Sequence, residues 1–426
     1  MKLNIHNGLR FLTTAMFFTG LLSSCNKDLP VAEPITQTPP SGSSIMETLN
    51  DPSYSFLKAA VTRASTVPSA TGTLSTLLAD KSGVFTFFAP DDNAFKASLT
   101  ALGLPADIGS INFFRPGQLD TIIKYHLIGG QTYTSATIAP VAPNLNLYLQ
   151  SSFVLQAPSA TLPPGYRMPV FAGKQGPVLF ANNIPVIQPN IAVANGVIHK
   201  VAFALLPPSQ VLWQRIAADP DLTYLLAAVQ RADEGDAAKT LESALKNAAA
   251  NLTVFAPTNL AFQQLLTGQI TVALIPLVTQ QLIAGGMDAA TAAATAPGLA
   301  QAQAAGLAST PGVFTNPALA SVLTPTTVKG LVVYHILGNR AFSVNLPTTA
   351  ANFPTLLNGA IAAHPGVGLQ ATFGGPLGVS AATVKGAANP SASNIVINPT
   401  PAPGGTSDQL YINGIIHKID QVLRPQ

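Results

Sequence analysis

Cysteine and charge are the scarcest features of this chain. It has 426 residues but one cysteine, so neither a disulfide framework nor a cysteine-based metal site can form within it. Charged residues make up 9% of the sequence, and 21 Lys and Arg against 18 Asp and Glu give a formal net charge of +3. Nucleic-acid binding needs clustered basic residues that neutralise phosphates, and the sequence has no such cluster. We therefore expect no nucleic-acid partner.

Motifs of catalysis are also missing from the sequence. It contains no HExxH, no Gly-x-Ser-x-Gly elbow and no glycine-rich phosphate loop. The sequence thus lacks the residues that are required for metal-dependent hydrolysis, for hydrolysis by an activated serine and for nucleotide binding. The sequence predicts that the protein is not an enzyme and uses neither a cofactor nor a metal ion.

The N-terminus has the pattern of a secretory signal. Lys2 and Arg10 precede an apolar run over residues 11–22, which is too short to span a membrane as a helix. The run ends in Leu22-Ser23-Ser24-Cys25, which resembles the bacterial lipobox, in which the cysteine is acylated and becomes the mature N-terminus. We predict a lipoprotein signal region over residues 1–25 with lipidation at Cys25. The alternative is an ordinary signal peptide whose thiol is incidental, or one that is cut just after the cysteine.

A lipid anchor would place the rest of the chain at a membrane surface. Acyl chains contribute about 0.8 kcal/mol per buried methylene, so several chains on one residue hold a protein on a bilayer. Residues 26–43 are rich in Pro, Thr and Ser and predict a semi-extended linker. Lys27-Asp28 is similar to the short charged export signals of bacterial surface lipoproteins. The sequence therefore predicts export and lipid anchoring to the bacterial outer membrane, at the cell surface.

The rest of the chain is a tandem repeat. Four landmarks recur in the same order: Asp51-Pro52 and Asp219-Pro220, Phe88-Ala89-Pro90 and Phe255-Ala256-Pro257, Tyr125-His126 and Tyr334-His335, and Asn195-Gly196-Val197-Ile198-His199-Lys200 and Asn413-Gly414-Ile415-Ile416-His417-Lys418. The offset between copies rises from 167 residues at Phe-Ala-Pro to 209 at Tyr-His, so the second copy carries an insertion of about 42 residues. Repeats of this length indicate two complete domains rather than a solenoid.

Both copies predict the same order of elements. A helical pattern broken at Asp-Pro comes first, followed by a β-rich run that ends at Ala-Pro because proline cannot donate to a strand ladder. Next come a capped turn into a helix, a helix that runs into Tyr-His, and short strand-like pieces. The last of these, from the Asn-Gly landmark onward, suits a buried final strand. The Ala-rich insertion, over about 268–324, predicts an extra helix at 272–283 and then a mobile loop.

These motifs resemble the fasciclin domain. The segments that carry the resemblance are Thr86-Phe87-Phe88-Ala89-Pro90-Asp91-Asp92-Asn93-Ala94-Phe95, Thr253-Val254-Phe255-Ala256-Pro257-Thr258-Asn259-Leu260-Ala261-Phe262, the two Tyr-His pairs and the two Asn-Gly-x-Ile-His closings. The resemblance predicts fasciclin-like domains at residues 44–207 and 209–425. It implies an α+β fold, in which each domain is a twisted β-sheet wedge flanked by helices, with a role in adhesion or extracellular binding. Asp420 follows the family pattern after the closing His, but Ala202 replaces it in the first copy.

The repeated polar residues raise the question of a site. They are Tyr125, His126, Asn195, His199, Tyr334, His335, Asn413 and His417. No repeated carboxylate accompanies the histidines as a ligand or general base, so we expect structural roles with ring nitrogens bonded to backbone. Asp91-Asp92 could form a carboxylate dyad, but Thr258-Asn259 replaces it in the second copy, which favours helix capping.

The loops offer a weaker functional signal. Tyr148, Tyr166 and Arg167 could stack on a sugar ring, or they could be ordinary loop and half-buried aromatic residues. The sequence leaves the binding residues unknown. Our hypothesis is an envelope-tethered adhesion or binding module for extracellular protein or glycan. The alternative is an accessory glycan-binding lipoprotein of a polysaccharide-uptake system, which would have an outer-membrane transporter as its partner.

Overall fold

The computed structural model describes residues 41–67, 72–138, 147–155, 162–163, 165–375, 377–401 and 404–426. The chain from Pro40 to Gln426 is one compact unit. The predicted signal region over 1–25, including Cys25, and most of the predicted linker over 26–43 lie outside the described residues. We call residues 44–207 the first repeat and residues 209–425 the second repeat.

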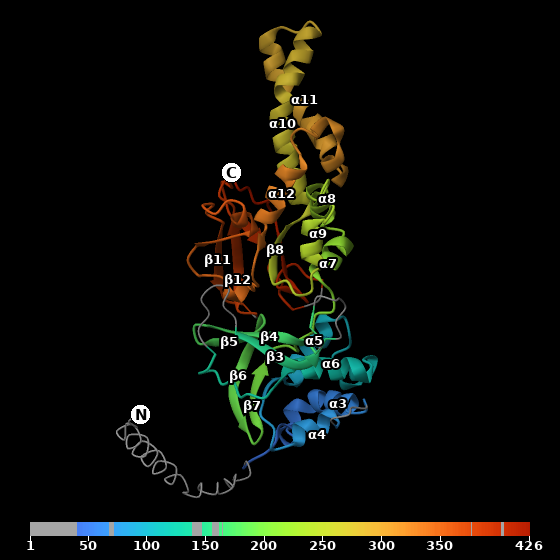
Figure 1. Cartoon of the computed structure of the whole chain (residues 1–426), viewed down its shortest axis with the longest axis vertical. Coiled ribbons are helices and arrows are strands. Elements are labelled where there is room, and N and C mark those ends of the chain that lie inside the picture. Colours follow the sequence, from blue (N-terminus) through green and yellow to red (C-terminus); the bar gives the residue numbers. More distant parts are fainter. Residues whose placement is uncertain are drawn as a thin grey trace, which may run out of the picture. The chain divides into compact units, whose positions relative to one another are not determined.

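The first repeat begins with helices and ends with strands (Figure 1). Its helical elements are α2 (Ile45–Thr48), η1 (Pro52–Tyr54), α3 (Ser55–Ala64), α4 (Leu74–Ala79), α5 (Asp92–Ala101), η2 (Ile108–Phe113) and α6 (Pro116–His126). Its strands are β1 (Phe85–Pro90), β2 (Leu127–Gly129), β3 (Leu147–Val154), β4 (Arg167–Gln175), β5 (Val178–Ala181), β6 (Ile184–Val193) and β7 (Gly196–Val201).

The second repeat has the same general order with additional elements. Its helical elements are α7 (Leu212–Ala218), α8 (Thr223–Ala232), α9 (Thr240–Lys246), α10 (Asn259–Ala284), α11 (Ala289–Leu307), η3 (Pro311–Thr315), η4 (Pro317–Leu319), α12 (Pro325–Tyr334), η5 (Ser343–Asn345) and η6 (Leu356–Gly359). Its strands are β8 (Leu252–Pro257), β9 (Ile336–Leu337), β10 (Ala351–Phe353), β11 (Val367–Phe373), β12 (Val379–Lys385), β13 (Ser393–Ile395), β14 (Gln409–Tyr411) and β15 (Gly414–Ile419).

Each repeat contains one parallel strand pair among its described strands. β1 runs parallel to β7, with Phe85 opposite Gly196, and β8 runs parallel to β15, with Leu252 opposite Gly414. The predicted final strand is thus confirmed in both repeats. The glycine at its start is required for close approach, because a Cβ at Gly196 would lie 1.9 Å from the Phe85 carbonyl oxygen and one at Gly414 would lie 2.4 Å from that of Leu252.

The two sheets differ in how they close. In the first repeat the strands pair in the order β1 to β7, and the pairing of β7 with β1 closes them into a barrel. In the second repeat the order is β10-β11-β12-β13-β15-β8-β9, with β14 added at β15. The mixed helix and strand content agrees with the predicted α+β class. The more specific description of each domain as a wedge stays a prediction.

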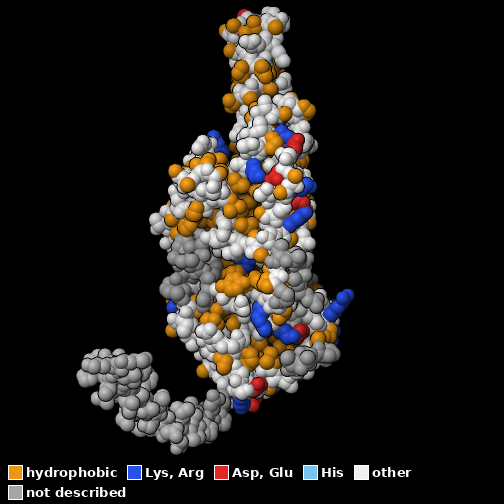
Figure 2. Space-filling view, in the orientation of Figure 1, with side chains coloured by type: hydrophobic (Ala, Val, Ile, Leu, Met, Phe, Trp, Pro, Cys, Tyr) orange, Lys and Arg blue, Asp and Glu red, His pale blue; other side chains and the backbone are white. Residues whose placement is uncertain are grey.

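The insertion in the second repeat is a helical hairpin. α10 and α11 pack against each other and extend beyond the rest of the second repeat in Figure 1. The predicted mobile loop is wrong where it falls on α11, because Ala has the highest helix propensity and Asp288 accepts a hydrogen bond from the Thr291 backbone N–H as an N-cap. Asp288 is the one charged residue between Asn259 and Val328. Figure 2 accordingly shows hydrophobic and uncharged polar atoms over most of the hairpin.

The repeats share apolar contacts. Phe171 on β4 and Phe180 on β5 belong to a buried cluster whose other members come from the second repeat, among them Phe342 and Val379. The Phe171 and Phe342 ring centroids lie 6.0 Å apart. Arg340, which is 4% exposed, places its guanidinium carbon 4.7 Å from the Phe171 ring centroid. Burial of these groups on both sides joins the two repeats directly.

Candidate functional site

The histidines of the Tyr-His pairs have matching environments. His126 is the last residue of α6 and His335 is the C-cap of α12; each precedes a short strand and is almost fully buried. In each ring Nδ1 lies 2.7–2.8 Å from the carbonyl oxygen four residues earlier, of Ile122 or Leu331. Nε2 accepts a 2.8 Å hydrogen bond from the backbone N–H of Leu205 in the first repeat and of Leu423 in the second. Both nitrogens of each ring are therefore occupied by backbone, with the proton on Nδ1.

The histidines of the final strands are held in the same manner. His199 Nδ1 accepts from the Asn190 backbone N–H at 3.2 Å, and Nε2 lies 2.7 Å from the Tyr133 carbonyl oxygen. His417 Nδ1 accepts from the Asp408 backbone N–H at 3.2 Å, and its Nε2 contacts the Ala341 carbonyl oxygen at 2.8 Å. A ring with both nitrogens bonded to backbone has no position left for a metal ion or a substrate proton.

The asparagines that precede the final strands connect helices to the sheet. Asn195 Oδ1 accepts from the Ile45 backbone N–H at 2.8 Å, while its Nδ2 donates to the carbonyl oxygens of Leu78 and Asp80. In the second repeat Asn413 makes the same three contacts. Its partners are Leu212, Leu245 and Asn247. These side chains satisfy buried backbone groups at helix ends, which otherwise lack partners.

The tyrosines of the Tyr-His pairs are fully buried as well. The Tyr125 hydroxyl donates to the Pro169 carbonyl oxygen at 3.0 Å and accepts from Asn182 Nδ2 at 3.2 Å. The Tyr334 hydroxyl donates to the Gly366 carbonyl oxygen at 2.6 Å and accepts from the Ala387 backbone N–H at 2.9 Å. Burial raises the pKa of both phenols. Neither hydroxyl is free to act as a nucleophile or an acid.

These positions are not assembled into a catalytic arrangement. Burial lowers the pKa of His126 and of His335 to about 4, so both rings are neutral near pH 7. Among the residues that the structure describes, no three His, Cys, Asp or Glu side chains gather as a metal site. The contacts of the repeated polar residues are those that a structural role requires, and that role stays our prediction for them.

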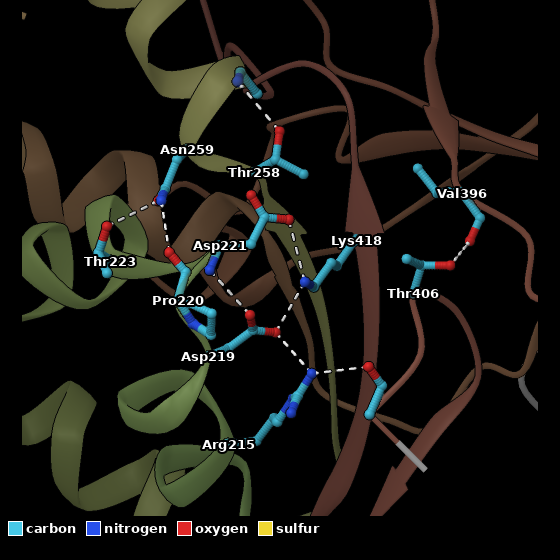
Figure 3. Close-up of polar contacts among 12 residues, drawn as sticks. Arg215, Asp219, Pro220, Asp221, Thr223, Thr258, Asn259, Val396, Thr406 and Lys418 are labelled. Atoms are coloured by element: carbon cyan, nitrogen blue, oxygen red, sulfur yellow. Dashed lines mark hydrogen bonds and ion pairs between the residues drawn. The ribbon is translucent and has the colours of Figure 1, made fainter. Parts of the chain in front are cut away.

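Asp91 and Asp92 do not face each other as a dyad. Asp91 accepts from the Ala94 backbone N–H at 2.9 Å as the N-cap of α5, whereas Asp92 binds Ser55 Oγ and the Phe56 N–H at the start of α3. The equivalent pair in the second repeat acts in the same way, as Figure 3 shows. Thr258 caps α10, and Asn259 contacts Thr223 at the start of α8.

Tyr148, Tyr166 and Arg167 lie together but contact protein groups. The two phenol oxygens are 2.7 Å apart, and Tyr148 packs its edge on Phe171 with centroids 5.5 Å apart. Arg167 donates to the Ser152 carbonyl oxygen at 3.3 Å. Tyr148 is 45% exposed, so it offers one accessible aromatic face at most. The proposed sugar-stacking role of this group stays a prediction.

A network of ion pairs stabilises the start of the second repeat (Figure 3). Asp219 contacts Arg215 at 2.8 Å and Lys418 at 2.9 Å, and Lys418 also binds Asp221 at 3.1 Å. Burial opposes ionisation of Asp219, but the cations and the Asp221 N–H together hold its pKa below the ordinary value. In the first repeat Lys200, the counterpart of Lys418, contacts Asp91 at 3.7 Å.

Arg215 also forms part of a cavity between the repeats, which is our candidate site. The cavity measures about 430 Å³, within the range of small-molecule sites. Its walls are the β5–β6 turn, the segment that joins the repeats and the loop before β14. The lining residues are Asn182, Asn183, Ile184, 204–210, Arg215, Pro401, Gly404 and 408–411.

Polar side chains from both repeats face this cavity. Asn183 is 8% exposed, and its side chain makes no hydrogen bond to any other described residue. Arg215 donates to the Gly404 carbonyl oxygen at 3.0 Å, which fixes its guanidinium beside the cavity. On another wall, Asp408 accepts from Ser343. Carboxylate, guanidinium and amide groups around a half-enclosed space can bind a polar, hydroxyl-rich ligand.

Sequence reasoning did not identify this cavity. Asn183 and Arg215 belong to no repeated motif, and they come together through the pairing of the two repeats. The one available signal was the Asn-rich segment between two strand-like runs at residues 178–193, because such loops carry binding residues on a rigid sheet.

Comparisons with known proteins find one family model that matches part of the chain. Residues 59–207 match the fasciclin domain. Among solved structures, the chain is similar to a FAS1 domain pair from the insect cell adhesion molecule fasciclin I, at 14% identity over 80% of this chain and 88% of that one. The TM-score is 0.28, which is too low for this likeness to bear on fold or function. No match was found among curated proteins.

Proposed function

We propose that this protein is an extracellular binding module, in which a fasciclin domain at residues 59–207 and its structural repeat hold a protein or glycan ligand between them. The observation that carries the proposal is the cavity between the repeats, where Asn183 presents an amide without a partner among the described residues. An amide at a cavity wall that makes no hydrogen bond to a described residue is available to a ligand that donates to it or accepts from it.

A glycan is the ligand class that this lining favours. Asn183, Arg215 and Asp408 offer amide, guanidinium and carboxylate groups, and sugar hydroxyls can donate to or accept from each of these. Tyr411 at the same wall is 6% exposed and adds an aromatic edge. The cavity volume of about 430 Å³ suits one or two sugar rings of a longer chain.

The experiment is a screen of the exported chain against glycan and matrix-protein arrays, followed by titration of any ligand found. Asn183→Ala should weaken binding by about tenfold, because one hydrogen bond to a ligand contributes roughly 0.5–1.5 kcal/mol. Asn251→Ala is the matched control, since Asn251 is exposed and does not line the cavity. Saturable binding that both variants retain equally would show that the ligand binds elsewhere.

The proposal includes tethering through Cys25 to the outer membrane. Its support is the lipobox pattern alone, since Cys25 lies outside the described residues. An accessory role in polysaccharide uptake would add an outer-membrane transporter as partner. Co-purification of such a transporter with the tethered protein is the measurement that separates this role from a general adhesin.

A further inference from the structure

A second cavity is lined by residues of the second repeat and by Gln426. It measures about 410 Å³ and is enclosed by the first turns of α10, by α12 and by the C-terminal segment. The lining residues are Phe262, Leu265, Leu266, Gln269, Phe314, Val322, Leu323, Thr326, Thr327, Val328, Gly330, Leu331, Leu357, Ile361, His364 and 424–426. It shares no residue with the cavity between the repeats.

The walls of this cavity are mostly apolar. Phe262 and Phe314 are almost fully buried behind it, and their ring centroids lie 5.9 Å apart. At the rim, Val322 is 54% exposed and Ile361 is 44% exposed. Large apolar side chains around a concave space leave hydrocarbon surface in contact with water, and an apolar ligand would cover that surface.

One cation lies at this apolar cavity without an anionic partner. The Arg424 guanidinium makes no ion pair or hydrogen bond with any other described residue, whereas the Arg424 backbone N–H donates to Asn389 Oδ1. His364, the other basic residue here, is already occupied. Its Nδ1 accepts from the Gly366 N–H and its Nε2 donates to the Pro425 carbonyl oxygen, both at 3.0 Å. Arg424 is thus the group available to an anionic head.

The insertion supplies several walls of this cavity, and the first repeat has no counterpart of these walls. Phe314 lies on η3, while Val322 and Leu323 lie in the segment between η4 and α12. All three fall in the predicted insertion over 268–324, which the first repeat lacks. A binding site at this position would therefore belong to the second repeat alone.

We propose that this cavity binds an aliphatic carboxylate, with the hydrocarbon chain against Phe262, Leu331 and Ile361 and the carboxylate on Arg424. The hydrocarbon gains from leaving water, and the carboxylate accepts two N–H bonds from the guanidinium fork. The site is separate from the one proposed for glycan or protein, and its failure would leave that proposal intact.

The test is calorimetric titration with decanoate and with its uncharged methyl ester. It uses the exported chain carrying Cys25→Ala, so that no detergent competes for the site. We expect one decanoate per chain, and at least about tenfold weaker binding after Arg424→Gln because the charged pair is lost. Binding of the methyl ester should be weaker than that of decanoate in the parent and unchanged by Arg424→Gln.

A blocking variant locates the site. Gly330 lies in α12, lines the cavity and has no atom within 4 Å of the position of an added Cβ, so Gly330→Leu should fill the space and abolish decanoate binding. Gly298→Leu is the matched control, because Gly298 is a helical glycine of α11 with the same open surroundings outside the cavity. Both variants should unfold at or above the parental temperature, since Leu favours helix over Gly.

Three outcomes would overturn the proposal. The first is the absence of saturable decanoate binding to the parent. The second is binding that Gly330→Leu leaves intact, which would place the ligand elsewhere. The third is equal affinity for decanoate and its methyl ester with no effect of Arg424→Gln, which would show that the anionic head is not recognised.

Discussion

Buried histidines in both repeats are kept neutral by the backbone around them. His126 and His335 accept a backbone N–H on Nε2, and a protonated ring could not accept this bond. Protonation would also place a charge in a fully buried position. At the scale of single residues, the repeated histidines thus tie the end of a helix to the chain end of the same repeat, and this link depends on pH.

The first prediction follows from that dependence. The folded-state pKa of each ring is about 4, below the ordinary 6.5, so the unfolded chain binds more protons than the folded one between these values. The contribution to stability is complete above pH 6.5 and is lost as the pH falls towards 4. Across this window each histidine should lower the unfolding free energy by about 1.4 kcal/mol per pH unit, or about 3 kcal/mol for each ring.

Urea unfolding between pH 7 and pH 4 measures this loss. The double variant His126→Gln/His335→Gln keeps a hydrogen-bond donor and acceptor at each position, but a glutamine amide does not bind a proton in this pH range. Its unfolding free energy should therefore vary less with pH than that of the parent. A variant with the same pH slope as the parent would show that other groups cause the acid sensitivity.

Asn195 and Asn413 give the second prediction. Each amide pairs three backbone groups at helix ends, and truncation leaves these groups buried without partners. Asn195→Ala and Asn413→Ala should each lower the unfolding free energy by roughly 2–4 kcal/mol, because an unpaired buried polar group costs about 1–3 kcal/mol. Asn251→Ala, at an exposed position, should change it by less than about 0.5 kcal/mol. Thermal or urea unfolding of the three variants checks this, and equal stability of all three would contradict it.

At the scale of elements, the helical hairpin is set apart from the repeat that carries it. The N-terminal half of α10 belongs to the main core of the second repeat through Phe262, Leu266 and Ile270. In its C-terminal half, Val278 packs with Ala296 and Ala300 of α11 in a small separate cluster. The outer part of the hairpin therefore contributes little to the core on which the domain depends.

Shortening the hairpin is the third prediction. Thr271 on α10 and Gln301 on α11 line the same open surface hollow, so a Gly-Ser-Gly turn can replace residues 272–300 between them. We expect the shortened chain to fold, with its unfolding free energy changed by less than about 2 kcal/mol and its helical circular dichroism reduced. Loss of the cooperative transition would show that the outer hairpin is part of the folding unit. Gly298→Leu in the intact hairpin serves as a control for altered sequence without shortening.

Sequence reasoning predicted the elements that local pattern determines. The strand after Asn-Gly was correct because apolar residues on both faces and a glycine at a close approach leave few other structures for such a run. The helix α11 was missed, because a run of Ala, Gln and Thr has no stripe of large apolar residues that would indicate a buried helix face. The buried residues of α11 include Ala292, Ala296 and Ala300, which are spaced four apart but are too small to stand out as a hydrophobic face in the sequence. The two cavities could not be predicted, because their walls come from segments far apart in the chain.

At the scale of the whole molecule, two features concern a membrane. One is the predicted lipid anchor at Cys25. The other is α10, the helix that, among the described residues, is long and apolar enough to cross a membrane by length and composition. Part of α10 is core, with Phe262 and Leu266 buried against the rest of the second repeat, so insertion of the whole helix would expose that core to lipid. Attachment through a lipid on Cys25, rather than through the hairpin, therefore stays our prediction.

Cys25→Ala distinguishes these two features and is the fourth prediction. Without the thiol no acyl chain can be attached, so the exported protein should move from the membrane fraction to the soluble fraction with its unfolding temperature unchanged. Ser23→Ala leaves the thiol in place and should stay with the membrane. If the Cys25→Ala variant also stays in the membrane fraction, the attachment lies in the folded part of the chain. The same fractionation is then applied to a chain that combines Cys25→Ala with the shortened hairpin. It would show whether α10 provides the attachment. Release only in that combined variant would overturn the lipid anchor and make the hairpin the membrane-binding element.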